Sequence, residues 1–279
     1  MNHSRTALMV LALILGGCAD PGRHADASRH ADELAQPAHL KRELIKTDSF
    51  ILTGFYRITR PDLPLTLYIE GDGKAWATRS QPSTDPTPYK ALGLALAASD
   101  PAANVVYLAR PCQFTPIPDN PRCDVTYWTD KRFAEEVVVA MNQAVTHYVA
   151  VGQQVNLVGY SGGGALAVLI AARRHDVASI RTVAGNLDHA EVNRLHRVTP
   201  MPASLNAIDV ARQVASIPQI HFSGAEDSVV PPSIAQRFVE ASGARCATLY
   251  VVPGMTHESE WAQRWPELLA KTPVCARTP

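Results

Sequence analysis

The most constraining feature of this sequence is the turn GYSGG at residues 159–163, which links an apolar run to a stretch of small residues. The apolar run covers residues 155–158, and the small-residue helical stretch covers residues 165–172. A G-x-S-x-G turn between a strand and a helix holds its serine, here Ser161, with Oγ exposed at the sheet edge. The glycines at positions 159 and 163 indicate that strand and helix approach each other too closely there for a Cβ. The alternative is a glycine-rich loop that binds an anion at the helix start.

A serine nucleophile requires a base, and the base requires an acid that orients it. Residues 217–222 predict a buried strand, and Asp227 follows it on a loop before an expected helix. Residues 247–252 form a β-branched run typical of a last central strand, and His257 lies in the loop after it. Three loops at the same end of a parallel sheet would bring Ser161, Asp227 and His257 together in the chain order Ser, Asp, His.

Other side chains compete for the acid and base roles. The competing acids are Glu226 and Asp188, which follows an expected strand at residues 179–184. Among the histidines, His221 falls within a strand and is expected in the core, whereas His189 is expected at the pocket rim. We assign the acid to Asp227 and the base to His257.

Stabilisation of an oxyanion is the remaining requirement. The backbone N–H of Gly162, directly after the serine, is one natural donor, and a second should come from the loop after an early strand at residues 65–69. With these motifs in this order, the chain resembles the α/β-hydrolase family over residues 50–269. Carried over by position, the resemblance makes the N–H of Asp72 the second donor, with Gly73 as the alternative.

This loop departs from the family pattern at two positions. Glu70 stands where the family usually has a histidine, and Asp72 places a carboxylate beside the expected oxyanion. A carboxylate directed at the oxyanion would oppose it electrostatically. We therefore expect both carboxylates to turn away and pair with a cation, Arg110 first and Lys74 second.

Four segments, residues 68–73, 108–113, 159–164 and 182–188, further resemble a group of bacterial α/β-hydrolase lipoproteins. This resemblance supports the fold and the three catalytic candidates and leaves the substrate open.

The N-terminus predicts export. Arg5, the apolar residues 7–15 and a lipobox-like LGGC ending at Cys18 indicate a signal peptide over residues 1–17, since nine apolar residues are fewer than the roughly 20 that span a bilayer. Lipidation of Cys18 would anchor the protein at the periplasmic face of a bacterial membrane, with the outer membrane favoured; ordinary cleavage would give a soluble periplasmic protein. Residues 18–46 are polar and predict a lipid-anchored flexible tether, followed by the hydrolase domain at residues 47–279.

The remaining cysteines are Cys112, Cys123, Cys246 and Cys275. Four cysteines allow three pairings. Cys112 and Cys123 bracket a proline-rich loop, and a bridge from Cys246 to Cys275 would fasten the C-terminal tail, so we favour two disulfides in an oxidising compartment. No C-x-x-C spacing is present, and we expect no metal site.

Net charge narrows the possible partners, and the alternation of strands and helices predicts the fold class. A formal net charge of zero argues against a nucleic-acid partner, which normally requires a basic surface. Apolar strands alternate with helices and predict an α/β-hydrolase fold, with a mostly parallel central sheet and helices on both faces. The expected helices cover residues 89–98, 132–149, 164–174, 232–241 and 259–270. Residues 186–214 interrupt this rhythm and predict a short cap, or else an ordinary long connection.

Together these residues predict a secreted or lipid-anchored serine hydrolase. We expect a carboxylic ester hydrolase that forms an acyl-enzyme on a small-molecule ester or amide and needs no cofactor. The alternatives are a serine peptidase or amidase, and a non-catalytic binding protein built on a hydrolase fold.

Overall fold

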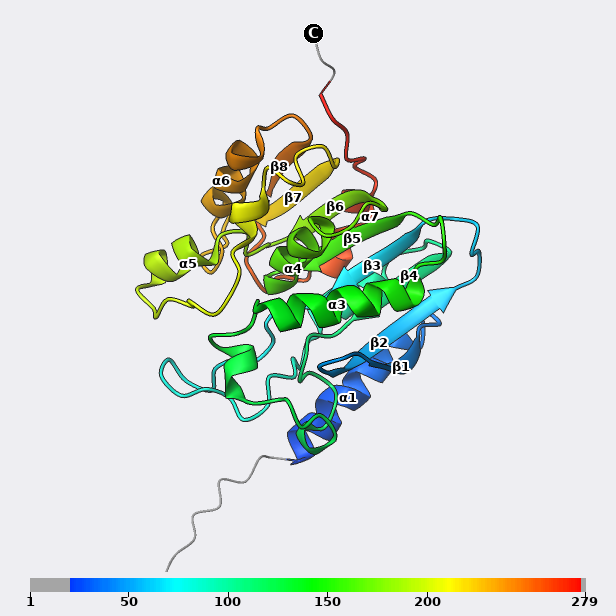
Figure 1. Ribbon diagram of the computed structural model, residues 1–279, viewed down its shortest axis with the longest axis vertical. Coiled ribbons are helices and arrows are strands. Elements are labelled where there is room, and N and C mark those ends of the chain that lie inside the picture. Colours follow the sequence, from blue (N-terminus) through cyan, green and yellow to red (C-terminus); the bar gives the residue numbers. More distant parts are fainter. Residues whose placement is uncertain (1–20, 277–279) are drawn as a thin grey trace, which may run out of the picture.

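The computed structural model describes residues 21–276 and is built around one eight-stranded sheet (Figure 1). The strand order is β1-β2-β4-β3-β5-β6-β7-β8. β2 pairs antiparallel with both β1 and β4, and all the other neighbours are parallel. The strands are β1 (Lys41–Lys46), β2 (Ile51–Ile58), β3 (Leu65–Ile69), β4 (Asn104–Leu108), β5 (Val155–Tyr160), β6 (Val177–Val183), β7 (Gln219–Gly224) and β8 (Ala247–Val252).

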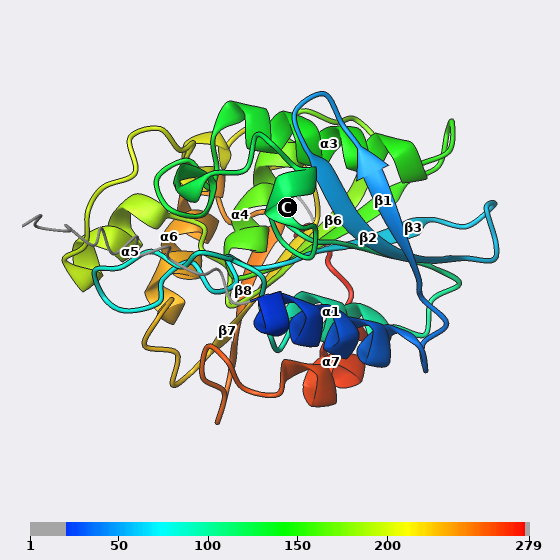
Figure 2. The ribbon, with the colours of Figure 1, turned by 90° about the horizontal axis from the view of Figure 1, so that it is seen from below.

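Helices cover both faces of the sheet, as a parallel sheet requires (Figure 2). One face packs against α3, α4 and α6, and the other against α1, α2 and α7. The helices are α1 (Pro21–Ala35), α2 (Leu92–Ala98), α3 (Glu135–Tyr148), α4 (Gly162–Ala171), α5 (His189–His196), α6 (Pro232–Ser242) and α7 (Trp261–Leu269). The predicted fold class is confirmed, and all five expected helices form within a few residues of their expected ends.

The segment expected to be a flexible tether is instead part of the fold. Residues 21–35 form α1, and residues 41–46 form the edge strand β1. Ala27, Ala31 and Ala35 recur every fourth residue, so they share one face of α1, and all three are buried in the cluster that includes α2. The prediction was wrong because small alanines give little hydrophobic signal, yet they allow a helix to pack closely.

Residues 186–214, which interrupt the strand–helix rhythm, form α5 and the short 3₁₀ helix η3 (Ala207–Val210). Two hydrogen bonds join this segment to Phe133, which lies two residues before the start of α3. The N–H of Leu205 donates to the carbonyl of Phe133 (3.0 Å), and the N–H of Phe133 donates to Oγ of Ser204 (3.1 Å). The segment is therefore anchored to the loop that enters α3.

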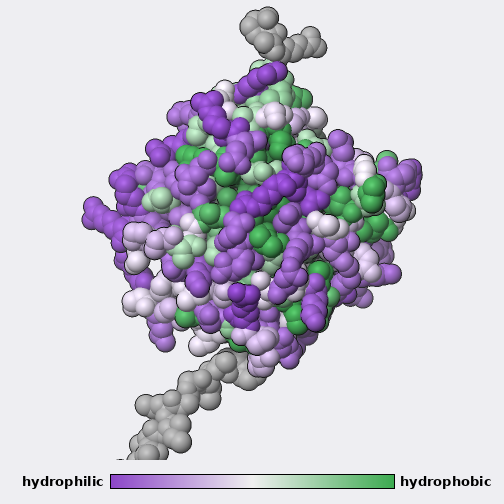
Figure 3. All heavy atoms as spheres, in the orientation of Figure 1, coloured by the Kyte–Doolittle hydropathy of each residue, from purple (hydrophilic) through white to green (hydrophobic). Residues whose placement is uncertain are grey.

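Two of the sequence predictions concern the N-terminus. The signal peptide at residues 1–17 and the lipidation site Cys18 lie outside the described residues. Within residues 21–276, no helix has the length and apolar character needed to span a bilayer. The face seen in Figure 3 is mostly hydrophilic, with scattered apolar residues.

Candidate active site

Ser161 sits at the junction of β5 and α4, at the carboxyl end of the parallel strands. Its backbone has φ 50° and ψ −119°, a conformation that L-residues rarely adopt and that costs of order 1–3 kcal/mol. A Cβ on Gly159 would lie 2.2 Å from the carbonyl oxygen of Gly163, and one on Gly163 would lie 2.2 Å from that of Ile69. The strand–turn–helix junction thus has the close approach expected from the sequence, and both glycines are required by it.

His257 and Asp227 form a continuous hydrogen-bonded chain with Ser161. Nε2 of His257 lies 3.0 Å from Oγ of Ser161, and Nδ1 of His257 lies 2.9 Å from Oδ2 of Asp227. The other oxygen of Asp227 accepts the backbone N–H groups of Val229 (2.9 Å) and Val230 (2.8 Å). These bonds fix the buried carboxylate, which can hold the imidazole with Nε2 toward the serine.

The backbone of His257 is held as firmly as its ring. Its carbonyl oxygen accepts the hydroxyl of Tyr160 (3.1 Å) and the indole N–H of Trp261 (3.1 Å). Burial raises the pKa of Tyr160, so this hydroxyl stays a neutral donor. Since Tyr160 directly precedes the serine, one bond couples the position of the histidine loop to the nucleophile turn.

The competing acid Asp188 is engaged elsewhere. It accepts the N–H of Glu191 as the N-cap of α5, the amide of Asn206 (2.9 Å) and the guanidinium of Arg237 (3.2 Å). Glu226, the other competing acid, is exposed, and within the part of the chain that the structure describes only its backbone N–H makes a hydrogen bond. Neither side chain contacts His257 through a hydrogen bond.

The competing histidines lie in the interior. His221 is buried in β7 with Nδ1 bonded to Oγ1 of Thr182 (2.9 Å), and burial lowers its pKa to about 3, as expected for a core histidine. His189, expected at the pocket rim, is instead only 5% exposed. Its ring stacks on Phe133 with 5.8 Å between centroids.

The loop after β3 lies directly against the nucleophile turn. A Cβ on Gly71 would lie 3.2 Å from Cβ of Ser161, and one on Gly162 would lie 2.1 Å from Oδ1 of Asp72. Within residues 21–276, the backbone N–H groups of Gly162 and Asp72 donate to no protein acceptor. Both therefore remain able to serve an oxyanion beside the serine.

The carboxylate of Asp72 pairs with Arg110, as expected, and also with Arg132. Oδ1 lies 2.8 Å from Nη1 of Arg110, and Oδ2 lies 2.8 Å from Nη1 of Arg132. Burial works to raise the pKa of Asp72, but the charges of Arg132 and Arg110 outweigh it and hold this pKa below its usual value. The second candidate, Lys74, does not take part in this pair.

The prediction that Glu70 pairs with a cation was wrong. Among the described residues, its buried carboxylate makes no ion pair and accepts four hydrogen bonds instead. The donors are the backbone N–H groups of Gly71 (2.9 Å), Gly93 (3.1 Å) and Leu94 (3.4 Å) and the hydroxyl of Tyr107 (3.0 Å). Burial raises the pKa of Glu70 against these donors, because the start of α2 and one tyrosine supply hydrogen bonds but no full positive charge.

A disulfide-closed segment between β4 and α3 supports the loop from outside. Gln113 donates from Nε2 to the carbonyl of Gly71 (3.0 Å) and accepts the N–H of Arg110 (3.1 Å). The adjacent Cys112 is bonded to Cys123, closing a segment that contains the 3₁₀ helix η1 (Ile117–Asp119) and precedes η2 (Val125–Trp128). The second expected disulfide, between Cys246 and Cys275, is also present and joins the start of β8 to the C-terminal tail.

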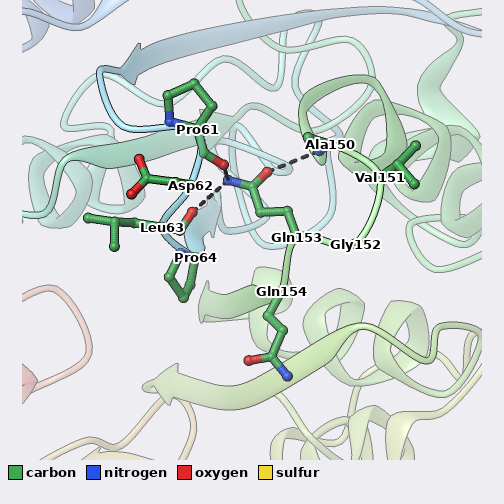
Figure 4. A pocket seen from close by; sticks show the side chains of 9 residues that line it. All are labelled: Pro61, Asp62, Leu63, Pro64, Ala150, Val151, Gly152, Gln153 and Gln154. Atoms are coloured by element: carbon green, nitrogen blue, oxygen red, sulfur yellow. Dashed lines mark hydrogen bonds between the residues drawn. The ribbon is translucent and has the colours of Figure 1, made fainter.

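A hollow of about 460 Å³, whose lining side chains are drawn in Figure 4, lies at the amino ends of the central strands β3 and β5. It is lined by residues 61–64, which precede β3, and residues 150–154, which precede β5. Gln153 crosses it and donates to the carbonyls of Leu63 (2.7 Å) and Pro61 (3.3 Å). Because Ser161 follows the other end of β5, this hollow is not part of the candidate site.

The sequence reasoning missed Arg132, Gln113 and Tyr160 as parts of the site. Tyr160 could have been found, since it directly precedes the serine. Arg132 and Gln113 lie in an irregular segment whose return to the loop after β3 has no periodic signal. Within residues 21–276, no cluster of three or more His, Cys, Asp or Glu residues could hold a metal ion.

Comparison with known proteins shows the fold. The sequence matches no protein-family model and no curated protein. The structure is similar to an esterase from Pyrococcus furiosus, with a TM-score of 0.54 and 13% identity over 83% of this chain and 90% of that chain. It is also similar to Est1E from Butyrivibrio proteoclasticus, with a TM-score of 0.55 and 14% identity over 82% of this chain and 98% of that chain.

A further similar structure is the acylaminoacyl peptidase from Pyrococcus horikoshii, with a TM-score of 0.55 and 11% identity over 83% of this chain and 40% of that chain. Together with the sheet order and the covered faces, these likenesses show that the chain has the α/β-hydrolase fold.

Proposed function

We propose that the protein is a serine hydrolase that cleaves carboxylic esters through an acyl-enzyme on Ser161. The observation that carries this proposal is the chain of contacts from Oγ of Ser161 through His257 to Asp227, at 3.0 and 2.9 Å. These distances are within the range needed for a base to take the proton of a nucleophile. The similar structures include both esterases and peptidases, which supports hydrolysis of an acyl bond.

The proposed reaction has two halves. Oγ of Ser161 attacks the substrate carbonyl while Nε2 of His257 takes its proton, and Asp227 holds the tautomer and stabilises the imidazolium. The N–H groups of Gly162 and Asp72 bind the tetrahedral oxyanion, which on enzymes of this kind contributes about 2.7–4 kcal/mol per donor. His257 then protonates the leaving alcohol, and water, activated by the same histidine, releases the acid.

The test is a panel of p-nitrophenyl esters of graded chain length, run beside peptide substrates with the wild-type protein and Ser161→Ala. We expect ester hydrolysis with turnover reduced on the order of 10⁶ in Ser161→Ala. Hydrolysis of peptides in preference to all esters would instead identify a peptidase. Failure to cleave either class, with the fold intact, would identify a binding protein.

We further propose that the protein is exported and anchored through a lipid on Cys18, as the resemblance to bacterial α/β-hydrolase lipoproteins implies. The proposal rests on the N-terminal sequence, with an apolar run followed by LGGC. Expression of the full chain in a bacterium, followed by membrane fractionation, tests it. We expect the wild type in the membrane fraction and Cys18→Ala outside it. If the wild type is found outside the membrane fraction, as Cys18→Ala is expected to be, the result would argue for a soluble periplasmic enzyme.

A further inference from the structure

A cluster of three charged side chains lies on the side of the nucleophile that carries Asp72. Two guanidinium groups, those of Arg110 and Arg132, share the single carboxylate of Asp72. This cluster touches the nucleophile turn, because Oδ1 of Asp72 would lie 2.1 Å from a Cβ on Gly162. The cluster thus holds one more cation than anion beside the proposed oxyanion donors, and the charge of the buried Glu70 also acts on Arg110.

Arg132 is the more exposed of the two arginines in the cluster. Its Nε donates to the carbonyl of Thr129 (2.9 Å) and its Nη1 to Asp72 (2.8 Å), which together fix the plane of the guanidinium. Among residues 21–276, Nη2 of Arg132 has no hydrogen-bonding partner and is not sealed from solvent, and the side chain is 17% exposed. Arg110, only 4% exposed, donates to Asp72 and to the carbonyl of Arg132. A fixed arginine with an uncommitted N–H edge is suited to a carboxylate or phosphate.

His189 lies next to this cluster. Its ring nitrogens are buried, and the backbone of Ser204 interacts with the ring. Its ring stacks on Phe133, whose other neighbour is the guanidinium of Arg110 at 5.1 Å from the ring centroid. The charges of Asp188, Arg132 and Asp209 act on the same imidazole.

The acidic groups nearby do not occupy Arg132. Asp188 is paired with Arg237 and Asn206, and Glu70 accepts four neutral donors. Asp130 has a buried Oδ1 but makes no ion pair with Arg132. The Nη2 edge is thus left for an acceptor that the described residues do not provide.

We propose that the acyl substrate of Ser161 carries a carboxylate or phosphate group, which Arg132 binds through Nη2. The inference rests on the proposed function and names its substrate class. Arg132 is then a specificity-determining residue that also holds the oxyanion loop through Asp72.

The test compares p-nitrophenyl half-esters of succinate, glutarate and adipate with their neutral methyl diesters. We expect wild-type kcat/KM to favour the acid form of at least one length by about 10- to 100-fold, the range for a hydrogen bond to a charged group. The preference should narrow as ionic strength rises. Phosphonate analogues of the same lengths, used as competitive inhibitors, distinguish a phosphate site from a carboxylate site.

Three substitutions separate binding from loop support. Arg132→Gln removes one ion pair of Asp72, which affects the hydrolysis of both substrates. The readout is therefore the ratio of kcat/KM for the acid form to kcat/KM for the diester, and we expect this ratio to fall toward one. Arg132→Lys should retain part of the ratio, and Arg132→Glu should invert it. The matched control is Arg122→Gln, since Arg122 lies exposed on the same segment and, among residues 21–276, bonds only to Ser49. The ratio for this control should equal that of the wild type.

Two results would overturn the inference while leaving the function intact. One is ester hydrolysis by the wild type without preference for any acid form, and the other is a preference that survives in folded Arg132→Gln. Reaction of Ser161 with a fluorophosphonate but no turnover of any half-ester would also overturn it alone. If Ser161 neither reacts with the probe nor cleaves any ester, the proposed function fails and the inference falls with it.

Discussion

Removal of each disulfide should affect catalysis and stability to different extents. Cys112–Cys123 closes a loop with a sequence separation of 11, and Cys246–Cys275 closes one of 29. In the chain-entropy model these loops stabilise the fold by about 3 and about 4 kcal/mol, respectively. Only the first bridge adjoins the site, because Cys112 lies between Arg110 and Gln113, which hold Asp72 and Gly71.

Paired alanine substitutions test this difference. Cys112→Ala with Cys123→Ala should lower kcat about tenfold or more, with the 10²–10³ of a lost oxyanion donor as the upper limit. Cys246→Ala with Cys275→Ala should lose more stability and leave kcat within about twofold. The assays are kcat on a p-nitrophenyl ester well below the unfolding temperature and denaturant unfolding of each variant.

A third variant connects the effect to the loop. Gln113→Ala removes the hydrogen bond to Gly71 while keeping both bridges, so it should reproduce part of the kcat loss with less loss of stability. The reasoning is refuted if the distant bridge costs as much turnover as the near one, or if the near bridge can be removed without any change in kcat.

Three further predictions follow from single contacts. Asp227→Asn should lower kcat about 10⁴-fold by releasing the histidine tautomer, whereas Asp188→Asn should change it only a few fold; equal effects in steady-state kinetics would reassign the acid. Gly163→Ala should lower kcat at least 10²-fold, on the order of one lost oxyanion donor, because its Cβ would lie 2.2 Å from the carbonyl of Ile69, where the oxyanion loop begins; unchanged kinetics would contradict the close approach. Folded His221 has a pKa of about 3, below the unfolded value of about 6.5, so its contribution to stability is present above pH 6.5 and is lost as the pH falls toward 3. At about 1.4 kcal/mol per pH unit, the free energy of unfolding falls by roughly 5 kcal/mol over this range. His221→Leu should reduce this dependence of the unfolding free energy on pH, and a variant with the wild-type pH dependence would refute the prediction.

The central part of the site could be predicted from sequence because each side chain follows a strand with a clear pattern. Ser161, Asp227 and His257 come after β5, β7 and β8, and the carboxyl ends of parallel strands meet at one edge. The structure brings these three together with ordinary hydrogen-bond distances. Their catalytic role stays a prediction until activity is measured.

The parts that were missed depend on contacts without periodicity. The partner of Asp72 was predicted only in part, because Arg132 comes from an irregular segment that returns to the site through its disulfide and hydrogen bonds. A cation was expected for Glu70 because a carboxylate directed at the oxyanion would oppose it, whereas four local donors satisfy this carboxylate here. The helix α1 was read as a tether because its buried face consists of small alanines.

Fluorophosphonate labelling with localisation of the adduct by mass spectrometry tests the central claim most directly. The account predicts one adduct, on Ser161, that is absent in Ser161→Ala and forms far more slowly in His257→Ala. A folded wild-type protein that takes up no probe, or an adduct that persists on another serine in Ser161→Ala, would contradict it.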